Sequence, residues 1–399
     1  MPPIGAYIHF PYCLKKCGYC DFASFEPPER RIDHKGYADA VLSELSARGV
    51  ALDGRRLESI FFGGGTPSLW EPAELGRVLE AILARASERA DEVEVTIECN
   101  PSSLDEARAR AFAAVGINRF SVGVQSLDRA RLEHLDRLHD AEGAKAAVRA
   151  ALATRVSGKG PRVSADLMMG VAPSFDAASH ETAEDAAREA LELAALGVGH
   201  LSAYQLTIEP NTRFGELHRQ GRLPLVGDDA MAASFLAVSA SLEGAGFRHY
   251  EISNYARPGE ESVHNLGYWR GHDYLGLGCA AYGTLSSRDA SRTAVRYRNA
   301  PNPEVYLSRA RAGDFTPHER EHLEPSTRLT ESIMLGLRLR EGLDLEGRAD
   351  ALGVEPWPAG RRRAAERLVA AGRLSMTAGR LAIPRDAWLF ADGTAARLF

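Results

Sequence analysis

Short apolar runs alternate with longer amphipathic segments through the first half of the chain, and this alternation restricts the fold most strongly. Six runs have the length and composition of strands: Gly5–Phe10, Leu57–Phe62, Val93–Cys99, Arg119–Val124, Arg162–Met168 and His200–Leu206. The segments between them carry charges at helical spacing, over Tyr37–Arg48, Pro72–Arg89, Leu104–Val115, Ala141–Thr154 and Glu181–Leu196. Repeated strand–helix units predict an α/β fold with a parallel sheet.

Polar groups at the strand ends favour a barrel over an open sheet. In parallel α/β folds, ligands bind at the carboxyl ends of the strands. The six predicted strands lead in turn to a cysteine-rich loop, Gly63-Gly64-Gly65-Thr66, Glu98, Gln125, Asp166 and Tyr204-Gln205. Because these groups should meet on one rim, we expect a partial (β/α)6 TIM-type barrel.

The second half of the chain has a different pattern. A helix over Asp228–Glu243 and a strand over His249–Ile252 should close the core, and Asn254–Leu285 has the composition of a structured loop. Helices over Thr327–Leu339 and Gly360–Ala371 precede a hairpin over Arg373–Ile383, turned at Ala378-Gly379. This order is typical of a small, helical, winged-helix-like C-terminal domain.

Composition sets further limits. The chain has 399 residues and a net charge of −6, which disfavours a general nucleic-acid binder. The run Arg361-Arg362-Arg363 is therefore interpreted as a solvated helix face. No apolar stretch is long enough to cross a bilayer, so we expect a cytoplasmic protein with reduced thiols. Cys99 and Cys279 lie beside apolar residues and should be buried.

Three cysteines follow the first predicted strand with the spacing C-x3-C-x2-C: Cys13, Cys17 and Cys20. One loop could thus bind three irons of a [4Fe–4S] cluster and leave the fourth iron open to a small molecule. A Cys3His zinc site with His9 is an alternative, although His9 lies inside a predicted strand. A disulfide framework is disfavoured because the chain is large and has five cysteines. The pattern favours the cluster over zinc or free thiols.

Charged residues near this rim suit a small zwitterionic ligand. Glu98 ends an apolar run, where an ionised carboxylate needs a partner. An amino acid-like ligand would need an acid for its ammonium and a base for its carboxylate, and Arg137, on the helix expected after Gln125, could be that base. The glycine loop at residues 63–65 lets backbone approach a ligand closely. No Lys-Ser/Thr follows it, so a Walker-type nucleotide site is disfavoured.

Together these motifs resemble the radical S-adenosylmethionine (SAM) enzymes, and within them the group around oxygen-independent coproporphyrinogen III oxidase. The resemblance implies that Cys13, Cys17 and Cys20 bind the cluster and that SAM chelates the open iron. It also implies a SAM shell of Tyr7, Tyr19, Gly64, Gly65, Thr66, Glu98, Gln125, Arg137 and Asp166. Tyr19 would pack near the adenine, Arg137 and Glu98 at the methionine end, and Gln125 with Asp166 at the ribose. The resemblance also divides the chain into a radical SAM core domain (1–235), a core-closing segment (236–322) and an oxidase-type C-terminal domain (323–399).

Two features direct the resemblance to the heme chaperone branch of this group. The oxidase carries a further cysteine two positions after the third cluster cysteine, where this chain has Phe22. Residues 264–269 match an H-N-x-x-Y-W motif associated with heme binding in that branch. His264 could supply an axial nitrogen, while Tyr268 and Trp269 offer flat apolar surface. The alternative is that a His-Asn pair caps a turn and the aromatic rings fill the core.

The resemblance therefore implies a heme chaperone that holds a [4Fe–4S] cluster and SAM, binds one heme per monomer and passes it to an acceptor protein. Further expected partners are an electron donor, a membrane-bound supplier of heme and a second copy in a homodimer, but not nucleic acid. The alternative is an oxidase that uses a SAM-derived radical to decarboxylate coproporphyrinogen III to protoporphyrinogen IX. Phe22 speaks against the oxidase, and whether the protein is an enzyme stays open at this point.

Overall fold

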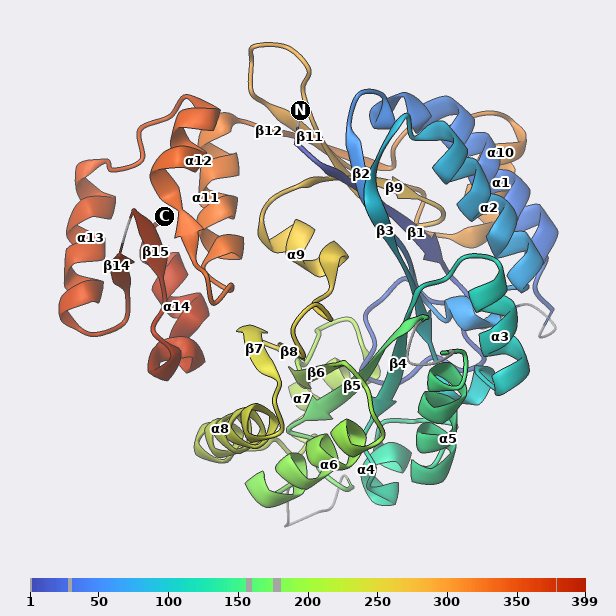
Figure 1. The fold of residues 1–399 in the computed structure, drawn as a ribbon, viewed down its shortest axis with the longest axis horizontal. Coiled ribbons are helices and arrows are strands. Elements are labelled where there is room, and N and C mark those ends of the chain that lie inside the picture. The colour runs from blue at the N-terminus through green and yellow to red at the C-terminus, as the bar shows by residue number, and fades with distance from the viewer. Residues whose placement is uncertain (1, 28–30, 156–159, 175–180, 378) are drawn as a thin grey trace.

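The computed structural model describes residues 2–27, 31–155, 160–174, 181–377 and 379–399. Six parallel strands form a curved sheet in the first half of the chain, as predicted (Figure 1). They are β1 (Ile4–Phe10), β2 (Arg56–Gly64), β3 (Glu88–Cys99), β4 (Arg119–Gln125), β5 (Arg162–Met169) and β6 (His200–Gln205). In the sheet order β1 lies between β2 and β9, and β6 between β5 and β8. The barrel is therefore open on one side, and the partial barrel is confirmed.

Helices cover the convex face of these strands. They include α1 (His34–Arg48), α2 (Pro72–Arg85), α3 (Glu106–Ala114), α4 (Arg129–His134), α5 (Ala141–Leu152) and α6 (Ala183–Ala195). The helix predicted over Pro72–Arg89 is too long, because α2 ends at Arg85 and β3 begins at Glu88. The first residues of β3 are exposed and charged, so their composition resembles a solvated helix.

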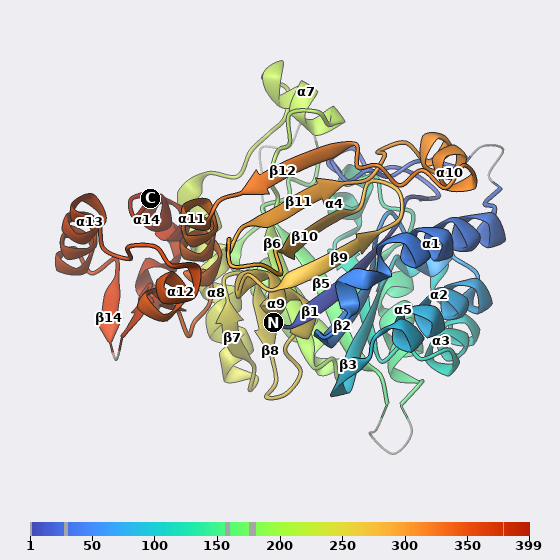
Figure 2. The ribbon, with the colours of Figure 1, turned by 90° about the horizontal axis from the view of Figure 1, so that it is seen from above.

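The segment Asn254–Leu285 is not a loop, contrary to the sequence-based expectation. It contains β8 (Asn254–Ala256), α9 (Val263–Trp269), β9 (Asp273–Leu277) and most of β10 (Tyr282–Ser286). β9 pairs in parallel with β1, and β10, β11 (Ala294–Arg298) and β12 (Glu319–Leu323) continue the sheet in antiparallel (Figure 2). β7 (Arg248–Glu251) and β8 extend its other edge beyond β6. These strands are short and rich in glycine, so the sequence shows no alternation of polar and apolar residues long enough to predict them.

The alternation of side chains along β1–β6 produces two different surfaces. Residues such as Ile8, Ile60 and Phe120 face the helices and form the main hydrophobic core. Residues on the concave side are mostly polar, among them Ser59, Thr96, Ser121, Ser164 and Ser202. Since hydroxyl groups do not pack into a dry core, the inside of the barrel is left as a place for a polar ligand.

The C-terminal region has its own core beside the open side of the barrel (Figure 1). Its elements are α11 (Pro325–Gly336), β13 (Leu343–Asp344), α12 (Leu345–Leu352), α13 (Ala359–Ala370), β14 (Ser375–Thr377), β15 (Arg380–Ala382) and α14 (Ala391–Ala396). The predicted hairpin is present as β14 and β15, although its turn residue Ala378 lies outside the described residues. Arg362 and Arg363 are exposed as expected, whereas Arg361 is buried and donates to Leu398 O and Pro356 O.

The remaining helices are α7 (Arg213–Arg219), α8 (Asp228–Gly244) and α10 (Pro303–Arg311). α9 lies between the C-terminal region and the barrel, in contact with α11, β1 and β2 (Figure 1). Within the described ranges, no helix combines the length and the hydropathy that a membrane span requires.

Candidate functional site

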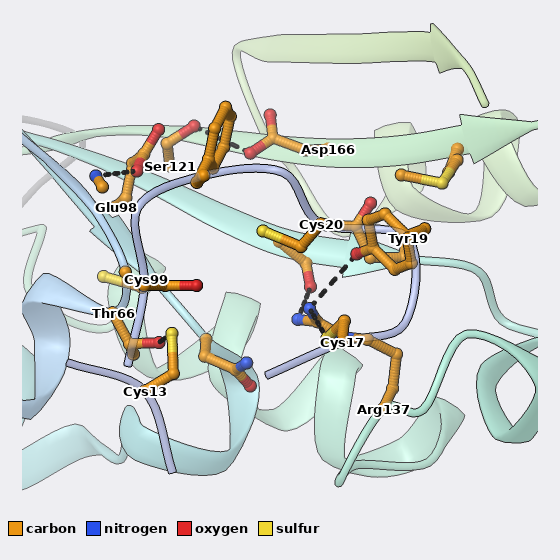
Figure 3. A pocket seen from close by; sticks show the side chains of 18 of the residues that line it. Cys13, Cys17, Tyr19, Cys20, Thr66, Glu98, Cys99, Ser121, Arg137 and Asp166 are labelled. Carbon is orange, nitrogen blue, oxygen red and sulfur yellow. Dashed lines mark hydrogen bonds between the residues drawn. The ribbon is translucent and has the colours of Figure 1, made fainter. Parts of the chain in front are cut away.

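The three cysteines lie in the loop after β1, at the carboxyl end of the strand. The loop closes on itself, because Cys13 N donates to Phe25 O at 3.0 Å and Phe25 N to Pro11 O at 2.8 Å. Cys13, Cys17 and Cys20 are half-buried free thiols that line one cavity (Figure 3). The loop therefore presents three sulfur atoms to a common space.

Two polar side chains lie close enough to the cysteine sulfur atoms to stabilise thiolates. Thr66 Oγ1 donates to Cys13 Sγ at 3.3 Å, and Arg137 Nη1 lies 3.6 Å from Cys17 Sγ (Figure 3). Burial raises the pKa of Cys13 and of Cys20. A bound iron would reverse this effect, since coordination removes the thiol proton.

The donor set fits a cluster better than zinc. His9 is buried, with Nε2 2.9 Å from Ala23 O and Nδ1 3.0 Å from Tyr7 OH, so neither ring nitrogen is free for an ion. Across the described parts of the chain, no three His, Cys, Asp or Glu side chains are grouped to hold a single metal ion. In a cubane cluster each thiolate binds a different iron, so the three sulfur atoms need not converge on one point.

The glycine loop after β2 packs directly against the cysteine loop. Gly65 N donates to Phe10 O at 2.7 Å, and Thr66 N donates to Tyr12 O at 2.8 Å. A Cβ at Gly65 would lie 2.7 Å from Tyr12 O, and Gly64 has a φ of +110°. Only glycine permits this approach, which brings Thr66 to Cys13.

Two buried carboxyl groups face the same cavity. Burial raises the pKa of Glu98 to about 7, opposed by a hydrogen bond from Gly64 N at 3.1 Å. Burial also raises the pKa of Asp166, which accepts from Ser121 Oγ at 2.9 Å and Ser164 Oγ at 3.3 Å. Protonated or ionised, these groups offer acceptors to ribose hydroxyls or to an ammonium.

Gln125 and Arg137 are placed by the turns around α4. Gln125 has a φ of 68°, in the left-handed region that a non-glycine residue seldom adopts. Arg137 lies in the turn after α4 rather than on the helix, which corrects the sequence-based expectation. Its Nη2 donates to Gly123 O at 2.9 Å, and its Nη1 lies 3.5 Å from Tyr19 OH. The guanidinium thus stands beside the cysteine loop.

These residues surround one cavity of about 510 Å³. The sequence-predicted residues that line it are Cys13, Cys17, Tyr19, Cys20, Gly64, Gly65, Thr66, Glu98, Gln125, Arg137 and Asp166. Tyr7 is not part of the lining and hydrogen-bonds with His9 instead. Residues that sequence reasoning missed include Arg119, Ser121, Ser202 and Asn265. The alternation of polar residues along the fourth strand could have identified the first two.

The three residues predicted to bind heme, His264, Tyr268 and Trp269, do not line this cavity. His264 is buried, with its ring 4.8 Å from that of Phe61 between centroids and its Nδ1 2.8 Å from Ser59 Oγ. Tyr268 meets the His264 ring edge-on, and Trp269 packs under the guanidinium of Arg338. In this conformation a heme cannot reach the His264 ring. Cys99 and Cys279 are buried as predicted, although Cys99 lines the cavity and Cys279 does not.

Comparisons with known proteins agree with this geometry. Residues 7–186 match the family model of the radical SAM superfamily, and residues 323–390 match that of the HemN C-terminal domain. Coproporphyrinogen III oxidase (HemN) from Escherichia coli has a similar fold, with a TM-score of 0.78 and 19% identity over 100% of this chain and 90% of its own. The protein is thus a radical SAM protein by fold and by motif, and this class implies a [4Fe–4S] cluster and SAM as cofactors.

Relatives in sequence identify the family to which the chain belongs within the radical SAM proteins. The heme chaperone HemW of Escherichia coli strain K12 is 40% identical over 86% of this chain and 84% of its own length. The radical SAM domain-containing protein 1 of Danio rerio mitochondria is 34% identical over 84% of this chain and 73% of its own. The chain belongs to the HemW family.

Replacing a loop cysteine should prevent cluster assembly. We expect Cys13→Ala protein, reconstituted without oxygen, to lose most of the roughly four irons per chain that wild type binds. Cys279→Ala is the matched control, because that thiol is buried outside the cavity, and it should retain its iron. Iron and sulfide analysis measures both. Equal iron in the two variants would contradict a cluster at this loop.

The raised pKa of Glu98 should appear in the pH dependence of stability. With a pKa of about 7 when folded, against roughly 4.3 when unfolded, the protonated group stabilises the cluster-free protein fully below about pH 4.3. This stabilisation is lost as the pH rises through 7. Glu98→Gln should therefore gain roughly 3 kcal/mol relative to wild type between about pH 4.5 and 8. Urea unfolding at several pH values measures the difference, and a difference independent of pH would refute the assignment.

Proposed function

We propose that the protein is a heme chaperone that holds a [4Fe–4S] cluster and SAM, binds one heme per monomer and transfers the heme to an acceptor protein. The relatives named HemW support this proposal, because they match over most of their own length. We place it in the cytoplasm with an electron donor, a membrane-bound heme supplier and a second copy of itself as further partners, and without nucleic acid.

The cavity supports specific roles for its residues. Cys13, Cys17 and Cys20 are the proposed cluster ligands. The proposed SAM shell consists of Tyr7, Tyr19, Gly64, Gly65, Thr66, Glu98, Gln125, Arg137 and Asp166. Arg137, beside Cys17, would hold the methionine carboxylate and Glu98 its ammonium, while Gln125 and Asp166 would hold the ribose. When bound, the cluster and SAM supply one-electron chemistry.

The observation that carries the chaperone proposal is the position of Phe22. Its side chain is 59% exposed and lines the mouth of the cavity beside the cysteine loop, together with Leu14 and Leu138. In the oxidase that the sequence resembles, a cysteine stands at this place. A phenyl ring can neither transfer a proton nor bind a metal, but it offers apolar surface to a flat macrocycle. The fold that the chain shares with that oxidase does not by itself decide the activity.

Heme titration and substrate incubation separate the two functions. Anaerobically reconstituted protein should develop a Soret band that saturates at one equivalent of heme. Coproporphyrinogen III should remain intact after incubation with the protein, SAM and a reductant. Formation of protoporphyrinogen IX would contradict the chaperone proposal and support the oxidase.

His264 is proposed as a heme ligand, with Tyr268 and Trp269 beside the macrocycle. Burial lowers the pKa of His264 to about 4, so the ring is neutral, and its Nε2 has no hydrogen-bond partner among the described residues. Such a nitrogen can bind iron once α9 moves. His264→Ala should therefore weaken heme binding about tenfold or more and leave the iron content of the cluster unchanged.

The matched control is His322→Ala, since that side chain is exposed on β12. It should bind heme like wild type in the same Soret titration. If His264→Ala bound heme as tightly as this control, His264 would not belong to the heme site.

A further inference from the structure

The cavity reaches far below the rim where the cysteines lie. Four alternating residues of β4, namely Arg119, Ser121, Gly123 and Gln125, all line it. At about 3.3 Å per residue, the backbone from Gln125 to Arg119 spans about 20 Å. The proposed SAM shell occupies the rim and the middle of this depth. A floor around Arg119 is left without an assigned ligand.

Arg119 is a buried guanidinium that forms an ion pair with Glu94 but no hydrogen bond to it. The residue is 2% exposed and yet lines the cavity. Its nearest acid is Glu94, at 3.9 Å between Nε and Oε2, which is too long for a hydrogen bond. Its Nε has no hydrogen-bond partner within the described ranges. Glu94 balances the charge of Arg119, but the guanidinium keeps hydrogen-bond donors that an acceptor from outside the chain could use.

Glu94 is already occupied by other donors. Its Oε2 accepts from Arg162 Nη2 at 2.6 Å and from Val263 N at 2.9 Å, and its Oε1 accepts from His264 N at 3.0 Å. Glu94 therefore holds the first turn of α9 and Arg162. The charge of Arg119 lowers the pKa of Glu94 from 3.9 Å away, and a closer approach of Glu94 to Arg119 would break those hydrogen bonds.

Asp166 is occupied in a similar way. Ser121 and Ser164 donate hydrogen bonds to its two oxygens. Burial raises the pKa of Asp166, and the charge of Arg119 opposes this rise. Glu98 accepts a hydrogen bond from Gly64 N. Burial raises the pKa of Glu98, and the charge of Arg119 opposes this less than that hydrogen bond does. Since burial raises the pKa of both carboxyl groups, neither is a strong counter-charge for Arg119.

Another buried arginine of this protein shows the usual arrangement. Arg131, with a side chain 5% exposed, hydrogen-bonds to both Glu181 and Glu189. Arg131 thus holds elements together through hydrogen bonds to two carboxylates, and the buried Arg55 does so through Asp273 and Ser286 O. Arg119 lines the cavity and forms no such hydrogen bonds among the described residues, so its guanidinium can bind a ligand there.

We propose that the floor of the cavity is a carboxylate-binding compartment in which Arg119 receives an acid group of the bound ligand. Asn265, which also lines the cavity, can donate a second hydrogen bond. A singly charged carboxylate suits the place better than a phosphate dianion, because Arg119 supplies a single positive charge. Phe61, which lines the cavity at the level of Arg119 in the sheet register, offers an apolar contact beside it. Resting on the proposed function, the inference identifies the acid group as a propionate of heme.

The test compares hemin with hemin dimethyl ester, in which both propionates are blocked. Each is titrated into wild type, Arg119→Gln and the control Arg110→Gln, which removes an exposed arginine of α3 that pairs with Glu106. Wild type should bind hemin about 10-fold to 100-fold more tightly than the ester. Arg119→Gln should bind hemin as weakly as wild type binds the ester, with no further loss for the ester itself. Arg110→Gln should behave like wild type.

SAM affinity, measured by equilibrium dialysis, distinguishes the floor from the rim. Arg119→Gln should bind SAM like wild type, whereas Arg137→Gln should not. Equal affinity of wild type for hemin and its ester would overturn the proposal without involving any variant. An equal loss of SAM binding in both variants would also overturn it, because the carboxylate would then belong to SAM. Absence of hemin binding to wild type would refute the proposed function together with this inference.

Discussion

The parallel alignment of β1 to β6 is the constraint on which the rest of the molecule depends. It brings the carboxyl ends of six strands to one rim, so that residues far apart in the chain share one cavity. The glycine loop then lets the ends of β1 and β2 lie in contact, which places Thr66 against Cys13. A bulkier side chain at Gly65 would separate the two loops and the donors with them.

Buried charges hold this arrangement in place. Glu189 accepts from Leu127 N and Ser126 Oγ, and Arg131 binds the same carboxylate, so the turn after β4 is fixed. That turn keeps Gln125 in a left-handed conformation, which costs about 1 kcal/mol or more. Elsewhere, Glu94 fixes the start of α9. Arg119 differs from these ion pairs, because it lines the cavity and lies 3.9 Å from Glu94 without a hydrogen bond to it.

α9 carries residues of both proposed sites, the cavity for SAM and the histidine for heme. Asn265 faces the cavity, while His264, one residue earlier, packs under Phe61 on the other side. The same helix contacts α11 of the C-terminal region. A heme ligand at His264 therefore requires α9 to shift, and such a shift would also change the floor of the cavity. This shared helix gives a physical route by which heme and the contents of the cavity can influence each other.

The sequence by itself determined the strand–helix alternation, the cysteine loop and most of the rim, because each of these is a local pattern of spacing or periodicity. It failed for β8 to β10, whose short glycine-rich strands exist only through pairing with distant neighbours. It also gave no sign that His264 is buried or that Arg119 lines the cavity with Glu94 3.9 Å away. Burial and pairing of a charge depend on what the folded chain brings around it, and only the tertiary structure decides that.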